Sequence, residues 1–256
     1  MSEFIKHYII MSSSYTDGTR VALDITDSEM LNNDTISKII KSIKETCGED
    51  VPLSTHLVET TSYSWESVTK YDPFFESVVC VDGLSTFIER IKESRKLTGL
   101  DVAIYILSKI KCTHLSLEKL VYFAYADYLC EYSKRLFDDT VFAFRHGPVV
   151  DSVFKKYNGS GSQYLTSFEI KNDSSVLTDV PEMSAKSRIL FAEDGAEKIR
   201  SIDKTIEKYG KCSASFLVDL THRSSSPWSH VDSSKSYQVI TDDLIKEFHI
   251  NECLTQ

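Results

Sequence analysis

The sequence predicts an α+β fold in which a small N-terminal α/β layer domain precedes a mainly α-helical domain with a short β element. Residues 1–97 mix strand-like apolar segments with helical apolar stripes, whereas the chain from residue 98 shows mostly helical spacing. At this change, Thr98 and Asp101 have the spacing of a helix capping box. The 256 residues, 41% of them hydrophobic, provide a core for each part. We therefore expect two domains, at residues 1–97 and 98–256.

Strands and helices alternate in the N-terminal domain. Branched and aromatic residues predict four strands, at about 4–11, 20–25, 55–61 and 76–81. Apolar residues at helical spacing predict two helices, the first with Ile36, Ile39, Ile40 and Ile43, the second with Leu84, Phe87, Ile88 and Ile91. Gly48 stands where the first helix should end. A small layered α/β structure is the simplest assembly of these elements.

A long helix over residues 115–134 dominates the second domain. Its apolar face covers so much of the circumference that neighbouring elements must surround it, and we expect its tyrosine hydroxyls to lie at the edge of the core. Val141–Phe144 follows as a strand, and Gly147-Pro148 predicts the start of a helix that runs to Tyr157. Segment 163–187 is polar and predicts an irregular excursion with one strand at 164–170. Three more helices are expected, at about 196–209, 214–220 and 242–248.

Charge and composition restrict the partners. The 29 Lys and Arg against 38 Asp and Glu give a net charge of −9 without any basic block, which disfavours nucleic acid as a partner and favours proteins. No apolar run approaches the roughly 20 residues that a membrane span needs. The apolar segment at 4–11 is interrupted by Lys6 and His7, which makes it too polar for a signal peptide. We expect a cytoplasmic protein with reduced cysteines.

The sequence contains no motif for a cofactor, a metal or a nucleophile. GxxxxGK[ST], GxGxxG, HExxH and GxSxG are all absent, and the cysteines form no CxxC pair. His222, His230 and Asp232 are the one local group with metal-ligand side chains, and no further ligand motif supports it. We therefore expect no cofactor, no metal and no enzymatic activity.

Three residues at element junctions have two interpretations each. His146 precedes Gly147-Pro148 and His222 follows a helix, so either ring could cap backbone groups or form part of a protein-binding surface. Trp228 follows Pro227 and could fill the core or anchor an interface.

An ordered series of motifs runs through the second domain: Asp101–Lys109, Leu115–Ala124, Leu136–Asp139, Phe142–Phe144, Gly147–Val150, Thr221-His222 and Ser226-Pro227-Trp228. This series resembles the Panacea domain, the SocA-like family of antitoxins from toxin–antitoxin pairs. It covers about residues 100–249 and leaves out 1–97. Two positions depart from the family pattern: Glu118, where Gln is frequent, and Phe144, where Trp is common.

The resemblance implies a non-enzymatic antitoxin that neutralises a cognate protein toxin by direct binding, the toxin usually being encoded by an adjacent gene. It also allows delivery of that toxin to a bacterial protease. Two turns belong to these motifs, one at Gly147-Pro148 and one after Thr221-His222. If they approach one another, we expect a partner-binding surface formed by Tyr122, Tyr125, Arg145, His146, His222, Arg223 and Trp228.

Two other interpretations remain open: a phage- or prophage-encoded regulatory protein that acts without a toxin, and a small cytosolic enzyme whose site is assembled from scattered residues. The N-terminal region has no assigned role, and its 10 Lys and Arg against 16 Asp and Glu, a net charge of −6 over residues 1–99, disfavour operator binding. The sequence makes no prediction of the toxin's identity or of the oligomeric state.

Overall fold

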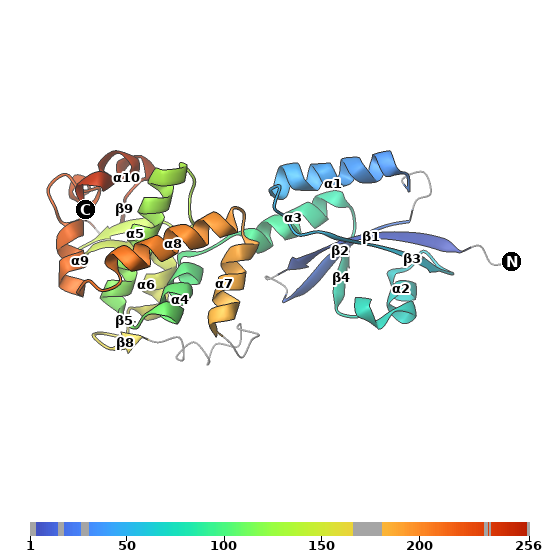
Figure 1. Ribbon diagram of the computed structural model, residues 1–256, viewed down its shortest axis with the longest axis horizontal. Helices are drawn as coiled ribbons and strands as arrows, with labels where there is room; N and C mark the ends of the chain where they lie inside the picture. Colours follow the sequence, from blue (N-terminus) through green and yellow to red (C-terminus); the bar gives the residue numbers. More distant parts are fainter. Residues whose placement is uncertain are drawn as a thin grey trace. The chain divides into compact units, whose positions relative to one another are not determined.

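The chain divides into two units in the computed structural model (Figure 1). The structure describes residues 4–14, 18–26, 31–165, 181–232, 235 and 237–254. The first unit comprises residues 1–96 with 191–194, and the second comprises 97–190 with 195–256. Helices and several small sheets occur together, which confirms the predicted α+β class.

A four-stranded mixed sheet forms the centre of the first unit. Its strands are β1 (Ile5–Ser14), β2 (Thr19–Ile25), β3 (Ser54–Thr60) and β4 (Val78–Val81), in the order β3-β1-β2-β4. Strand β1 pairs antiparallel with β2 and β3, whereas β4 pairs parallel with β2. The four predicted strands are confirmed, with small differences at their ends.

Helices cover both faces of this sheet (Figure 1). Side chains alternate along β1, so Ile10 packs on the face covered by α1 (Asn33–Cys47) and α3 (Leu84–Arg95). Ile9 packs on the opposite face, with Val68 of α2 (Trp65–Tyr71) and Phe75 of η1 (Pro73–Phe75). Helix α1 ends at Cys47 with Gly48 as its C-cap, where the sequence predicted its end, whereas α2 and η1 were not predicted.

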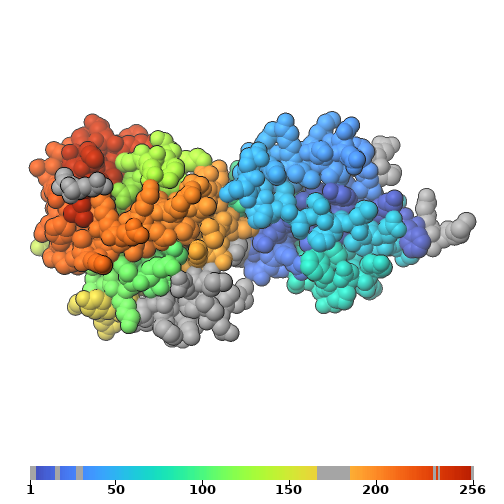
Figure 2. All heavy atoms as spheres, in the orientation of Figure 1, coloured from blue at the N-terminus to red at the C-terminus, as the bar shows by residue number. Residues whose placement is uncertain are grey.

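Helix α5 (His114–Tyr132) is the centre of the second unit. Every residue from Ser116 to Ala126 is buried, because other elements surround the helix. Its neighbours include α4 (Gly99–Lys109), β7 (Gly147–Val150), α8 (Gly195–Tyr209), α9 (Ala214–Thr221) and α10 (Asp242–Phe248). The orange atoms of α8 and α9 form much of the visible surface of this unit (Figure 2). The prediction of a helix surrounded by neighbours is confirmed, and so is the Thr98–Asp101 capping box at the start of α4.

Short elements complete the second unit. They are β5 (Cys112–Thr113), β6 (Val141–Phe144), α6 (Asp151–Tyr157), β8 (Tyr164–Leu165), α7 (Pro181–Phe191), η3 (Trp228–His230), β9 (Gln238–Val239) and η4 (His249–Asn251). Strands β7, β6 and β9 form one small antiparallel sheet, and β5 pairs with β8. Most of the predicted strand at 164–170 lies outside the described residues.

The prediction that Gly147-Pro148 starts a helix is wrong, because this segment is strand β7 and the helix begins at Asp151. Strand β7 lies at the edge of its sheet, where a proline costs no ladder hydrogen bond. Buried side chains of α5 also stabilise the extended backbone of β7 through hydrogen bonds. Lys119 Nζ donates to the Pro148 carbonyl at 2.6 Å, and the Val150 N–H donates to Glu118 Oε2 at 2.9 Å.

Candidate partner-binding surface

The β6–β7 turn carries Arg145 and His146 at its tip, and side chains of α5 hydrogen-bond to the backbone of β7 beside it. Gly147, which closes the turn, has a φ of +95°, and a Cβ there would lie 2.5 Å from Thr221 Oγ1. Only glycine fits both the backbone conformation and the space. Arg145 and His146 are exposed, whereas the residues from Gly147 to Val150 are buried. The turn is therefore a rigid support for two exposed polar side chains.

Burial changes the acidity of the lysine under this turn. The side chain of Lys119 is fully buried, and this burial lowers its pKa from 10.5 to about 8, although Glu118 and Glu252 act in the opposite direction. The unfolded chain therefore binds more protons than the folded chain between about pH 8 and 10.5. In this window the folded state is expected to gain stability as the pH rises.

Replacement of Lys119 by Met is expected to remove this gain. At about 1.4 kcal/mol per pKa unit, the wild-type unfolding free energy should rise by about 3 kcal/mol relative to Lys119→Met between pH 7 and 10.5. Urea unfolding of both proteins across this range measures the difference. Parallel pH profiles for the two proteins would contradict the assigned burial of a charged lysine.

The segment after α9 approaches the β6–β7 turn, so the two motif turns lie close together, as the predicted surface requires. His222 is the C-cap of α9, and its Nδ1 lies 2.8 Å from the Val218 carbonyl oxygen. Its Nε2 lies 3.2 Å from the Arg145 carbonyl oxygen. Trp228 Nε1 donates to the Phe144 carbonyl at 2.8 Å, and its ring centroid is 3.8 Å from that of His222. Both side chains are half-buried and join the two turns through backbone atoms.

The two histidines differ in their roles. His222 confirms the capping interpretation, because its ring contacts the end of its own helix. His146 is exposed, and its ring makes no hydrogen bond to the described part of the chain, so the predicted backbone cap is absent there. His146 therefore remains available at the tip of the turn.

The expected place of Tyr122 and Tyr125 on a surface is wrong, because both side chains are 0% exposed. The Tyr122 hydroxyl donates to the buried Glu252 at 2.6 Å. The Tyr125 hydroxyl donates to Asp242 at 2.6 Å and accepts from Arg135 Nε at 2.8 Å. Carboxylates from the C-terminal part of the chain thus satisfy both hydroxyls inside the unit. The two tyrosines therefore support the fold and are not part of an exposed partner-binding surface.

An aromatic cluster that the sequence did not reveal lies beside the turn. Phe142 and Phe144 share one face of β6, and Tyr237 stands edge-on to both, with ring centroids 5.5 Å apart in each case. Tyr237 is 62% exposed. We call the group Phe142, Phe144, Arg145, His146, Trp228 and Tyr237 the Arg145 surface. Antiparallel pairing of β6 with β9 brings Tyr237 to this surface, and β9 is too short to predict from the sequence.

Arg223 faces a different part of the second unit. Its side chain is exposed, and Nη1 donates to the Cys253 carbonyl at 3.0 Å. Arg223 therefore links the segment after α9 to the C-terminal residues. It lies outside the Arg145 surface as we define it.

A network of buried polar side chains surrounds His249. Its Nδ1 lies 2.8 Å from Glu252 Oε1 and its Nε2 lies 2.9 Å from Asp127 Oδ1. Burial opposes protonation of His249, but hydrogen bonds to Asp127, Cys253 and Glu252 outweigh it and raise the pKa of this imidazole well above its usual value. Burial raises the pKa of Glu252, although His249 and Tyr122 act in the opposite direction.

The group with metal-ligand spacing within the described residues is Asp127, His249 and Cys253. The His222, His230 and Asp232 group suggested by the sequence does not have this spacing. His249 and Cys253 are separated by three residues, a local signal that was present in the sequence, whereas Asp127 comes from distant α5.

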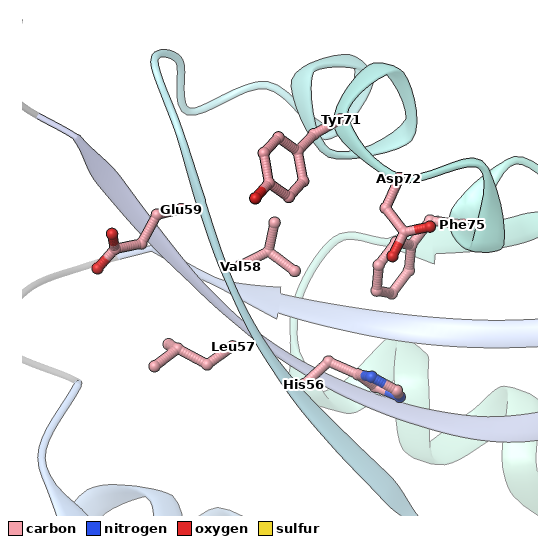
Figure 3. Close-up of a pocket in the computed structure, with 7 residues that line it drawn as sticks. All are labelled: His56, Leu57, Val58, Glu59, Tyr71, Asp72 and Phe75. Atoms are coloured by element: carbon pink, nitrogen blue, oxygen red, sulfur yellow. The ribbon is translucent and has the colours of Figure 1, made fainter.

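The first unit has a groove at the edge of its sheet (Figure 3). Strand β3 and the α2–η1 segment form it, with His56, Leu57, Val58, Glu59, Tyr71, Asp72 and Phe75 as lining residues. Leu57 is 62% and Tyr71 is 70% exposed. Strand β3 has no partner on its outer side among the described residues, because the sheet order ends with it. Exposed apolar side chains beside an unpaired strand edge are features that recognition sites share.

Part of the second unit is similar to known proteins. Residues 117–229 match the family model of the Panacea domain of SocA-like antitoxins. Over 119 residues it is 29% identical to "Antitoxin SocA" of Caulobacter vibrioides (strain NA1000 / CB15N). This alignment covers 46% of the chain and 59% of the relative, so the chain spans less than two thirds of that protein. No solved structure is significantly similar.

Proposed function

We propose that this protein is the antitoxin of a toxin–antitoxin pair and neutralises a cognate protein toxin by direct binding. The observation that carries the proposal is the match of residues 117–229 to the Panacea domain, and these residues include the β6–β7 turn and Trp228. In this proposal the toxin is the product of an adjacent gene, and both proteins act in the cytoplasm. Residues 98–256 form the antitoxin domain, and residues 1–97 form a separate domain with its own role.

The Arg145 surface has the properties of a binding hot spot. Arginine, tyrosine and tryptophan dominate such sites, and this surface presents Arg145, Trp228 and Tyr237 together. Hydrogen bonds from His222, Trp228 and Lys119 hold its backbone, so little conformational freedom is lost on binding.

Among the described helices, none has both the length and the apolar composition needed to cross a bilayer. Arg145 and the aromatic residues beside it offer polar and apolar contacts at one place, as protein interfaces do.

Growth of a bacterial host tests the proposal. We expect the open reading frame adjacent to this gene to arrest growth when expressed alone, and co-expression of this chain to restore growth, since binding removes free toxin. Colony counts with and without the chain measure the effect. A neighbour that is harmless, or one that remains toxic in the presence of the chain, would contradict the proposal.

The same strains separate simple neutralisation from delivery to a protease. Neutralisation by binding leaves the amount of toxin unchanged, whereas an adaptor lowers it only while the protease is present. Immunoblots of the toxin in wild-type and protease-deficient hosts distinguish the two mechanisms. Equal toxin levels in all strains would assign rescue to binding alone.

A further inference from the structure

Three potential metal ligands converge between α5 and the C-terminal segment. Asp127 lies on α5, His249 begins η4, and Cys253 follows four residues later. One ligand atom from each lies within 4.8 Å of the others. His249 is buried, whereas Asp127 and Cys253 are half-buried, so the group borders solvent on one side. An ion could therefore enter without unfolding of the unit.

A second layer of hydrogen bonds aims the ligand atoms at one point. Glu252 Oε1 lies 2.8 Å from His249 Nδ1 and also accepts from the Tyr122 hydroxyl at 2.6 Å, which leaves Nε2 facing Asp127 and Cys253. The Thr205 hydroxyl donates to Asp127 Oδ2 at 3.0 Å and leaves Oδ1 facing His249. A carboxylate on the second ring nitrogen is the usual support of a zinc-bound histidine.

The two ligand pairs that include His249 Nε2 fit zinc with a small adjustment, and the carboxylate of Asp127 lies within 4.8 Å of Cys253 Sγ. At Zn–S of about 2.3 Å and Zn–N of about 2.0 Å, two ligands of a tetrahedral ion lie about 3.5 Å apart. Cys253 Sγ and His249 Nε2 are 3.5 Å apart. Asp127 Oδ1 is 2.9 Å from Nε2 and must move away by about 0.4 Å to reach the spacing of an oxygen and a nitrogen ligand. Its side chain is 24% exposed and has room for this movement.

We infer that Asp127, His249 and Cys253 form a zinc site with three protein ligands and a fourth position open to solvent. Thiolate, imidazole and carboxylate together suit Zn²⁺, whereas Mg²⁺ and Ca²⁺ prefer oxygen ligands alone. Zn²⁺ would bind the thiolate of Cys253 and the unprotonated Nε2 of His249, so any proton on either atom is released to solvent on binding.

Zinc at this site would join the C-terminal segment to the central helix. The Cys253 carbonyl accepts from Arg223 Nη1, so the site also borders the segment after α9 that carries Trp228. The proposal is independent of the antitoxin function, because it concerns ion binding by the purified chain.

Zinc titration of the full chain under reducing conditions tests the site. Calorimetry should show one Zn²⁺ bound per chain, and Cys253→Ser should weaken binding by about 100-fold or more, since ligand loss exceeds the 10–100-fold effect of second-shell changes. Cys212→Ser is the matched control, because Cys212 is also a half-buried free thiol but lies outside the group. It should bind zinc like the wild type.

Cobalt provides an independent readout. Bound Co²⁺ should give a near-ultraviolet thiolate charge-transfer band in the wild type and in Cys212→Ser, and none in Cys253→Ser. Thermal unfolding without metal shows whether each variant folds. If Cys253→Ser does not fold, Asp127→Asn, which retains the Thr205 contact, replaces it as the ligand variant. Absence of zinc binding, or equal binding by the wild type and the ligand variant, would overturn the inference and leave an ion-paired histidine.

Discussion

Leu120→Ala is expected to lower the unfolding free energy of the second unit by about 2–5 kcal/mol, the range for a buried leucine cut to alanine. Leu120 is 1% exposed in the middle of α5, and the surrounding elements cannot collapse into the space it leaves. The matched control is Leu190→Ala, since Leu190 is also helical but 45% exposed. Its effect should stay within about 0.5 kcal/mol.

Tryptophan fluorescence can follow the second unit alone. The chain has two tryptophans, Trp65 in the first unit and Trp228 in the second. In a Trp65→Phe background, denaturant unfolding detected by Trp228 reports the stability of the second unit. Equal midpoints for Leu120→Ala and the background protein would mean that α5 is not the centre of the core.

Arg145→Glu is expected to weaken toxin binding about tenfold or more while the melting temperature changes little. Arg145 is exposed at the tip of a fixed turn, so charge reversal should cost at most about 0.5 kcal/mol of stability. Loss of a hot-spot arginine costs about 2 kcal/mol or more of binding free energy. Affinity and melting temperature should be measured on the same preparation.

Two controls locate the effect. Lys211→Glu makes the same charge change at another exposed position of the second unit and should leave affinity intact. Leu57→Arg alters the groove of the first unit (Figure 3) and should also be neutral. If Leu57→Arg weakens binding and Arg145→Glu does not, the toxin site lies in the first unit. A large drop in the melting temperature of Arg145→Glu would mean that Arg145 has a structural role.

Local patterns were sufficient for most elements. The apolar stripe from Ile36 to Ile43 predicted α1, and the Thr98–Asp101 spacing predicted the cap of α4. Capping and periodicity depend on residues a few positions apart, so one segment contains the whole signal. Strand β7 was missed because Glu118 and Lys119, some 30 residues earlier, stabilise its extended backbone.

The candidate surface was only partly predictable, because it also depends on residues far apart in the sequence. The approach of the two motif turns was expected, and contacts of His222 and Trp228 with the β6–β7 turn confirm it. Tyr122 and Tyr125 were placed on the surface because the carboxylates that satisfy them, Glu252 and Asp242, lie more than 100 residues away. Their burial leaves the Arg145 surface as the exposed part of the motif.

Direct binding between the purified chain and the purified product of the adjacent gene is the measurement that tests the central claim. We expect a stable complex of the two proteins, with nanomolar to micromolar affinity typical of specific protein pairs. The complex should form with the wild type and with Lys211→Glu and be weakened by Arg145→Glu. A toxic neighbour that forms no complex with the folded wild-type chain would contradict the assignment of this protein as an antitoxin that acts by direct binding.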